Sequence, residues 1–122
     1  MVIKKFNENF SVCKIKDLSG VDFSDKFCFV GKTDEELSLV CLSDKVPSNV
    51  TEKDEGWKAM RIQGELDFSL IGILSKISGI LAQHSIGIFA ISTYNTDYIL
   101  TKTENYERAI LALKEAGYEI EV

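Results

Sequence analysis

The second half of the chain changes between two hydrophobic periods, and this alternation restricts the fold more than any other feature. Residues 57–63 alternate between apolar and polar types, which is the period of a half-buried strand. Residues 70–84 carry apolar residues at helical spacing, with Asp67 or Ser69 available as the N-cap. The predicted core stripe of this helix is Ile71, Leu74, Ile77 and Leu81. The pattern therefore predicts a strand followed by an amphipathic helix.

The elements that follow complete a six-element pattern. Residues 86–92 and 97–102 read as two strands separated by a short polar turn. Thr103 is the predicted cap of a second helix, and a last strand is predicted at 118–122. The apolar face and the left-handed end of that helix are predicted at Tyr106, Ala109, Ile110, Leu113, Ala116 and Gly117. The order β-α-β-β-α-β predicts a ferredoxin-like α+β fold, with two helices on one face of an antiparallel sheet.

The first half of the chain is rich in predicted strands. Residues 10–15 alternate, and two further apolar runs at 27–30 and 37–41 flank a polar turn, which predicts a hairpin. Residues 43–56 collect charged and turn-forming types and the single proline, so they are expected to be a solvated connection. We therefore expect an abbreviated N-terminal module over 1–56 and a complete module over 57–122.

Composition narrows the class of partner. The 122 residues are 45% hydrophobic and carry a net charge of −5, whereas a nucleic-acid surface needs a basic stripe. No apolar run reaches the ~20 residues that span a membrane. No apolar segment follows the basic residues near Met1, as a signal peptide would require. A cytoplasmic protein without nucleic-acid or membrane partners is expected.

The sequence contains no arrangement of side chains that requires catalysis. Cys13, Cys28 and Cys41 stand in apolar surroundings without a C-x-x-C pair, and are expected to be buried thiols. The one histidine, His84, follows the predicted helix and is expected at its solvated end. Because neither a metal-ligand set nor an acid–base pair is evident, we expect a non-catalytic protein without metal or cofactor.

The first predicted helix is apolar on more than one face. Beside its core stripe it carries Ile73 and Ile80, seven residues apart. It also carries a stripe of small residues, Gly72, Ser75, Gly79 and Ala82. One interpretation is close packing of the helix on its own sheet. The other is a helix covered on both sides by a second module or subunit, and this favours a homodimer through the first helix and adjacent strands.

The richest polar cluster spans residues 92–97, directly between two apolar strands. By itself it is typical of a hairpin turn. The alternative is the rim of a ligand site, together with the loop at 65–69 before the first helix. A helix N-terminus can bind a carboxylate, and Asp67 or Asp97 could receive an ammonium. Ile71 and Ile88 could wall an aliphatic side chain, so the cluster has the chemistry that a free amino acid requires.

Two segments of the chain resemble the ACT domain family. They are residues 67–74 and residues 86–100, which include the string Ser-Thr-Tyr-x-Thr-Asp-Tyr-Ile-Leu at 92–100. That string resembles one branch of the family, the short bacterial tandem-ACT proteins related to the cytosolic arginine sensors called CASTOR proteins. Residues 26–41 resemble the first module of the same branch. The resemblance implies two ACT-like modules, the first of them abbreviated, and amino-acid binding rather than catalysis.

The resemblance also implies a ligand site at an interface between ACT modules. Gly87 and Ile88 match positions that contact the backbone of the amino acid in the sensors. The remaining implied or adjacent site residues are Asp67, Phe68, Ser69, Leu70, Ile71, Ser92, Thr93, Tyr94 and Asp97. Leu70 stands where the arginine sensors have an acid, so a hydrophobic or small amino acid is expected rather than arginine.

Two functions follow from these expectations. The first is a sensory protein that binds a free amino acid and passes the signal through its dimer interface. The second is a structural or protein-interaction module with a vestigial pocket.

Overall fold

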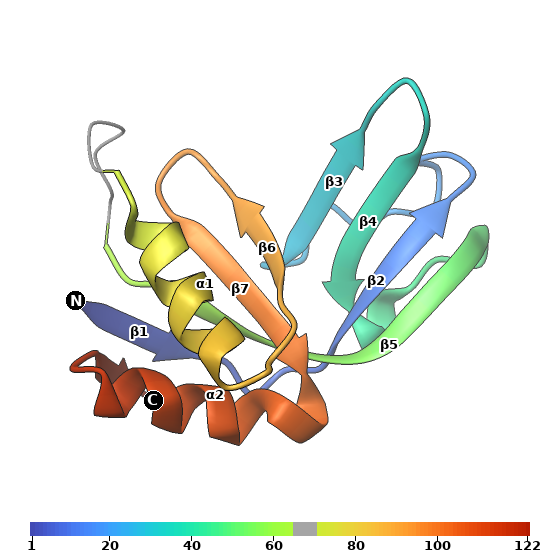
Figure 1. Ribbon diagram of the computed structural model, residues 1–122. Helices are drawn as coiled ribbons and strands as arrows, with labels where there is room; N and C mark the ends of the chain where they lie inside the picture. The colour runs from blue at the N-terminus through green and yellow to red at the C-terminus, as the bar shows by residue number, and fades with distance from the viewer. Residues whose placement is uncertain (65–70) are drawn as a thin grey trace. The chain divides into compact units, whose positions relative to one another are not determined.

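The computed structural model describes residues 1–64 and 71–122, which form two compact units (Figure 1). The C-terminal unit consists of Met1–Asn7 and Lys58–Val122, and the N-terminal unit of Glu8–Trp57. The division at Trp57 falls one residue from the expected boundary at 56. Residues 1–7, expected in the first module, instead belong with the C-terminal unit because they form a strand of its sheet.

The C-terminal unit contains the predicted β-α-β-β-α-β order. Its elements are the end of β5 (Val50–Ile62), α1 (Ile73–Gln83), β6 (Phe89–Ser92), β7 (Asp97–Lys102), α2 (Thr103–Glu115) and β8 (Glu119–Glu121), with β1 (Val2–Lys5) added to them. The strands are ordered β6-β7-β5-β1-β8. This arrangement confirms the ferredoxin-like α+β prediction.

Strand β1 was not predicted from the sequence. It pairs antiparallel with β5, where Ile3 lies opposite Ile62, and parallel with β8, where Ile3 lies opposite Ile120. The backbone N–H of Glu119 donates to the carbonyl of Met1 at 3.1 Å. Only Ile3 is buried among its four residues. A strand this short, with two lysines, carries too few apolar residues to show a period of two.

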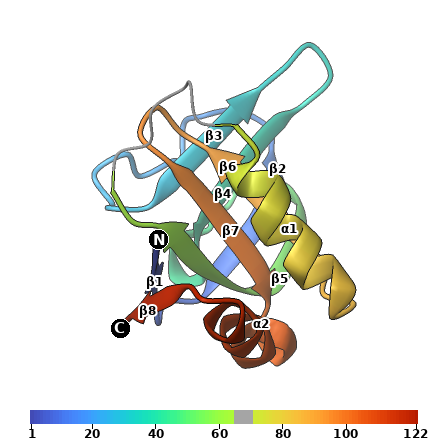
Figure 2. The same ribbon diagram turned by 60° about the vertical axis from the view of Figure 1, so that its left-hand side comes forward.

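Both helices cover one face of the C-terminal sheet (Figure 2). Residues from both helices and from β1, β5 and β7 form a single apolar cluster, which includes Ile3, Met60, Ile62, Ile77, Leu81, Ile99, Tyr106, Ala109 and Leu113. Met60 and Ile62 alternate with Arg61 along β5, so Arg61 projects from the face of the sheet that the helices leave uncovered.

Helix α1 starts later than the sequence predicted. Helix α1 begins at Ile73, because Gly72 before it adopts a left-handed conformation with φ 82°. Ile71, predicted in the core stripe, consequently lies before the helix and is 91% exposed. The predicted N-caps Asp67 and Ser69 lie outside the described residues.

Helix α2 buries its predicted face except at its end. Thr103, the predicted cap, is instead the first helical residue, and the N-cap position is held by Lys102, whose side chain makes no capping hydrogen bond. Ala116 follows the helix and is exposed, because the helix ends at Glu115. Gly117 is left-handed with φ 104°, as predicted.

The N-terminal unit is a sheet in the order β3-β4-β2-β5. Its elements are β2 (Phe10–Ile15), β3 (Cys28–Lys32), β4 (Leu37–Leu42), the short 3₁₀ helix η1 (Ser43–Lys45) and the first part of β5. The β3–β4 hairpin confirms the prediction, with Lys32 opposite Leu37. The order β3-β4-β2 parallels β6-β7-β5 of the C-terminal unit, without long helices between the strands.

The expected solvated connection at 43–56 is wrong in its second half. Residues from Val50 onward form β5, which pairs antiparallel with β2 and places Glu52 opposite Lys14. The side chains of residues 51–56 are all exposed. Because backbone pairing forms this strand while its side chains face water, no hydrophobic period marked it in the sequence.

The three thiols share the core of the N-terminal unit. Cys13 and Cys41 are buried and Cys28 is half-buried, and all three are free. Cys28 lies opposite Cys41 in the β3–β4 register. Burial raises the pKa of all three thiols, that of Cys41 to about 12. The prediction of buried thiols is thus confirmed for Cys13 and Cys41.

Candidate functional site

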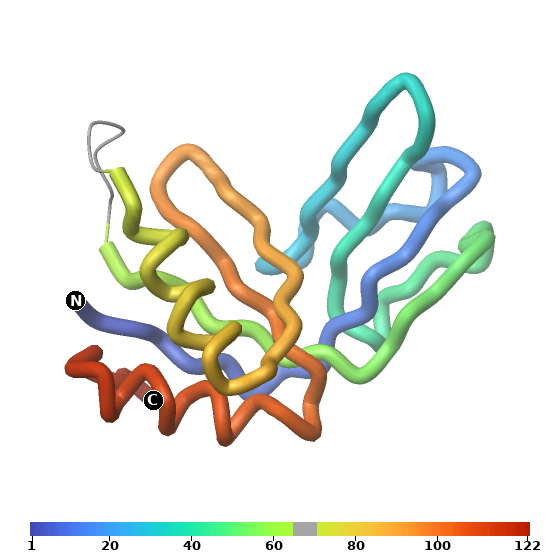
Figure 3. Tube along the Cα trace, viewed as in Figure 1, coloured from blue at the N-terminus to red at the C-terminus, as the bar shows by residue number. Residues whose placement is uncertain are grey.

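The polar segment between β6 and β7 forms a tight hairpin (Figure 3). Ser92 and Asp97 lie opposite one another, and the Ser92 hydroxyl donates to the Asp97 carboxylate at 2.5 Å. The Thr93 N–H donates to the Thr96 carbonyl at 2.8 Å, which leaves Tyr94 and Asn95 at the tip. The Tyr94 side chain is 77% exposed. The hairpin interpretation is correct, and the hairpin presents polar side chains to solvent.

Thr96 fastens this hairpin to the end of β5. Its hydroxyl donates to the Ile62 carbonyl at 2.6 Å, and its side chain is buried. The Thr93 hydroxyl also donates to the Thr96 carbonyl at 3.0 Å. Thr96 belongs to the polar cluster, but sequence reasoning did not select it as a site residue because its hydroxyl partner lies 34 positions away.

A polar pocket of about 250 Å³ lies between this hairpin and the end of β5. Its lining includes Arg61, Gln63, Thr93, Asn95 and Tyr98. Among the described residues that line it, Thr93 is the one that the sequence predicted as a site residue. Arg61 was missed, although the alternation in residues 57–63 already set it opposite Met60 and Ile62.

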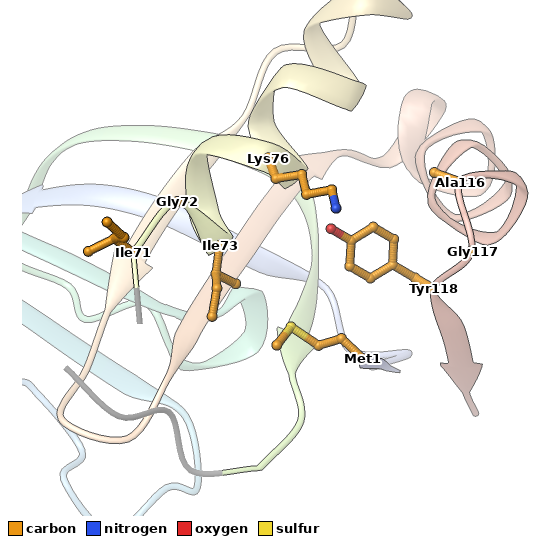
Figure 4. A pocket seen from close by; sticks show the side chains of 8 residues that line it. All are labelled: Met1, Ile71, Gly72, Ile73, Lys76, Ala116, Gly117 and Tyr118. Carbon is orange, nitrogen blue, oxygen red and sulfur yellow. The ribbon is translucent and has the colours of Figure 1, made fainter. Parts of the chain in front are cut away.

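A larger cavity of about 320 Å³ lies beside the start of α1 (Figure 4). Ile71 and Ile73 line it, together with residues of the turn between α2 and β8. The Lys76 ammonium and the Tyr118 hydroxyl point toward one another across it (Figure 4). This cavity therefore combines apolar side chains with the Lys76 ammonium and the Tyr118 hydroxyl.

The predicted site residues are distributed over several places. Asp67, Phe68, Ser69 and Leu70 lie outside the described residues. The β6–β7 hairpin and its base carry Ser92, Thr93, Tyr94 and Asp97. Gly87 and Ile88 precede β6, with Gly87 exposed and Ile88 partly buried against the core of the C-terminal unit. Ile71 lines the larger cavity, whereas Ile88 does not, so the two do not form a common wall there.

Helix α1 keeps one face of small residues open. Gly72, Ser75 and Gly79 are exposed, and so is Ala82. The additional apolar residues Ile73 and Ile80 are partly buried against the unit's own core, so this part of the second face is explained by packing within the chain.

His84 is exposed at the end of α1, as predicted. Its Nδ1 lies 2.9 Å from the Ile80 carbonyl. Within residues 1–64 and 71–122, no three His, Cys, Asp or Glu side chains are grouped so as to hold a metal ion. Neither α1 nor α2 is long and apolar enough to cross a membrane.

Comparison with solved structures supports the fold. A protein from Agobacterium tumefaciens is 29% identical, with a TM-score of 0.85 over 98% of this chain and 90% of the other. Aspartate kinase from Clostridium acetobutylicum, described as an allosteric enzyme, is 18% identical with a TM-score of 0.67 over 93% of this chain, which spans only 33% of the kinase. The regulatory subunit of aspartate kinase from Thermus thermophilus is 12% identical, with a TM-score of 0.63 over 94% and 96%.

Models of known protein families match both the N-terminal and the C-terminal part of the sequence. A search of curated proteins finds no significant match. A model described as an N-terminal domain matches residues 8–49, close to the N-terminal unit. The ACT domain model matches residues 52–115, which contain β5 from its third residue onward, both helices, β6 and β7. The chain belongs to the ACT domain family.

Proposed function

We propose that this protein is a non-catalytic regulatory protein of the cytoplasm that senses a free amino acid. The observation that carries the proposal is the ACT domain match over residues 52–115. The fold shared with a separate regulatory subunit of aspartate kinase supports it. The resemblance of residues 92–100 to the arginine-sensor branch supports the same class of ligand.

The ligand is proposed to bind where two ACT-like units meet. The N-terminal unit, with its matching strand order, is in this proposal the abbreviated ACT-like module. The site uses the β6–β7 hairpin, the Gly87–Ile88 segment and the loop before α1, which includes Asp67, Phe68, Ser69 and Leu70. The position of the hairpin supports this placement, because its tip is at the surface of the C-terminal unit, where the Tyr94 side chain is 77% exposed.

A homodimer is proposed to provide the interface. Its contact is the small-residue face of α1, formed by Gly72, Ser75 and Gly79, together with adjacent strands. These residues are exposed in the single chain, and small side chains allow close approach of another backbone. A ligand that contacts both subunits stabilises the arrangement that closes on it, and this differential affinity is the physical basis of a signal.

A thermal-shift screen tests the proposal. The purified full-length protein is melted with each of the twenty amino acids at millimolar concentration. Selective binding raises the melting temperature in proportion to RT ln(1 + [L]/Kd). We expect a hydrophobic or small amino acid to give the largest shift and arginine to give none.

Charge reversal locates the site. Asp97→Lys should abolish the shift, because it removes the carboxylate that is proposed to receive the ligand ammonium. Asp34→Lys makes the same change in the exposed turn of the β3–β4 hairpin and is the matched control. A shift that survives Asp97→Lys would refute the site. A folded dimer without any amino-acid response would refute the sensor and favour the interaction module.

A further inference from the structure

The guanidinium of Arg61 is held in a fixed orientation on the helix-free face of the C-terminal sheet. Its Nε donates to the Gln63 side-chain carbonyl at 3.0 Å, and one Nη donates to the Tyr98 hydroxyl at 3.1 Å. The guanidinium carbon lies 4.9 Å from the centre of the Phe6 ring and 5.6 Å from that of Tyr98. Two hydrogen bonds and two ring contacts therefore orient this group before any ligand arrives.

The hydrogen bonds that Arg61 makes with the described residues leave some of its donors available. A guanidinium carries five N–H donors, and the two bonds to Gln63 and Tyr98 use two of them. Arg61 lines the pocket of about 250 Å³ beside the β6–β7 hairpin. A planar group with parallel free donors is suited to bidentate binding of a carboxylate.

The charge of Arg61 is also uncompensated by the part of the chain that the structure describes. Ion pairs among those residues join lysines to acids, as between Lys4 and Glu121, and Arg61 belongs to none of these pairs. Asp97, the acid of the neighbouring hairpin, accepts instead from Ser92. A half-buried cation that has no acidic partner within residues 1–64 and 71–122 favours an anion in the adjacent space.

The lining of the pocket selects the same chemistry. Besides Arg61 it presents the amide groups of Gln63 and Asn95 and the hydroxyls of Thr93 and Tyr98. The described lining residues include no aliphatic side chain other than threonine methyls. The pocket is thus suited to the charged end of a small molecule and not to a hydrocarbon side chain.

We propose that Arg61 binds the α-carboxylate of the regulatory amino acid, with Gln63 and Tyr98 as positioning residues. This inference rests on the proposed function. It assigns the carboxylate to a side chain of β5, whereas the sequence pointed to the N-terminus of the first helix and, by resemblance, to Gly87 and Ile88. The amino-acid side chain then extends out of the polar pocket, so Arg61 determines that a carboxylate binds and not which amino acid carries it.

Calorimetric titration of the full-length protein tests the role of Arg61. The probes are the amino acid that gives the largest thermal shift and its carboxamide, which lacks the negative charge. We expect the carboxamide to bind about ten-fold or more weakly, because a charge-assisted hydrogen bond is lost. Arg61→Met should weaken the binding of the amino acid by a similar factor. Arg61→Lys keeps the positive charge and should retain part of the affinity that Arg61→Met loses.

A second variant keeps the arginine and its ring contacts. Gln63→Glu places a carboxylate 3.0 Å from the Arg61 Nε position and should compete with the ligand, again weakening binding about ten-fold or more. Lys114→Met removes one positive charge from the exposed end of α2 and is the matched control, expected to bind like the parent. This design remains informative if Arg61→Met fails to fold.

A probe independent of amino-acid sensing separates the two proposals. Sodium acetate is titrated against the protein at constant ionic strength with sodium chloride, and the Arg61 Nε–H signal is followed by NMR. A saturable change at this signal supports the carboxylate site. If an amino acid binds but Gln63→Glu and Arg61→Met bind it unchanged, the Arg61 inference is overturned and the sensor stands. If no amino acid binds while acetate shifts Arg61, the sensor is overturned and the anion pocket stands.

Discussion

The Thr96 hydroxyl donates a 2.6 Å hydrogen bond to the backbone carbonyl of Ile62, joining the β6–β7 hairpin to the end of β5. These two positions border the two sides of the polar pocket, one beside Asn95 and the other between Arg61 and Gln63. The bond therefore sets the distance between the hairpin and the arginine. Because the Thr96 hydroxyl is buried, loss of this bond would leave the Ile62 carbonyl without a water molecule to replace the donor, and this lowers the free energy of unfolding.

Thr96→Val should lower the free energy of unfolding by about 1–3 kcal/mol, because it leaves the Ile62 carbonyl without its donor at nearly constant side-chain volume. Urea unfolding followed by circular dichroism measures the loss. Thr51→Val removes an exposed hydroxyl bonded to the Lys14 carbonyl and should change stability by less than about 0.5 kcal/mol. If both substitutions lowered the free energy of unfolding equally, the buried Thr96 hydrogen bond would stabilise the protein no more than the exposed bond of Thr51.

Ile3→Ala tests whether β1 belongs to the C-terminal core. Ile3 is fully buried against residues of both helices, so truncation should cost about 2–5 kcal/mol in the free energy of unfolding. Val122→Ala, at an 87% exposed position, is the control with little expected effect. A cost for Ile3→Ala below that of the control would contradict the pairing of β1 between β5 and β8.

Stability should decrease in alkali because two buried groups resist ionisation. Burial raises the pKa of the Cys41 thiol and of the Tyr106 hydroxyl, each to about 12. The folded state thus holds these protons more tightly than the unfolded chain. The contribution of each group to the free energy of unfolding is fully present below its ordinary pKa, which is about 9 for Cys41 and 10 for Tyr106. That contribution is lost as the pH rises toward about 12.

Urea unfolding at a series of pH values between about 8 and 11 measures this slope. Tyr106→Phe should lower stability at neutral pH, because the Ala59 carbonyl loses a 2.6 Å hydrogen bond, but it should flatten the alkaline decrease. Tyr94→Phe, on an exposed ring, is the control and should retain the slope of the parent. An unchanged slope in Tyr106→Phe would remove Tyr106 from this explanation.

Two glycines near each other should respond oppositely to alanine. Gly72 has φ 82°, so Gly72→Ala should destabilise the protein by about 1 kcal/mol through backbone strain. Gly79 lies inside α1 with open space around its added Cβ in the single chain, so Gly79→Ala should stabilise the monomer by about 0.5–1 kcal/mol, apart from any effect on the proposed dimer contact. Thermal unfolding of the two variants side by side gives the comparison, and the same sign for both would contradict the structure of the α1 start.

The sequence predicted those elements whose side chains bury one face. The hydrophobic period identified β2 and α2, and apolar segments beside polar turns identified the β3–β4 hairpin and β7, because these segments contribute side chains to a core. It missed the start of β5, where residues 51–56 are exposed on both faces and only backbone pairing with β2 makes a strand. It also misplaced Ile71, because a left-handed Gly72 changes the helical phase without any change in hydrophobic spacing.

The polar hairpin at 92–97 could be predicted from the sequence, because turn-forming residues between two apolar strands strongly favour a hairpin turn. The pocket was not. Arg61, Gln63 and Asn95 become neighbours only when β7 returns beside β5 and Thr96 closes on Ile62. Local periodicity thus determined the elements and their order. Tertiary pairing between segments more than thirty residues apart decided which polar groups share a pocket, because hydrogen bonds of that span leave no local pattern in the chain.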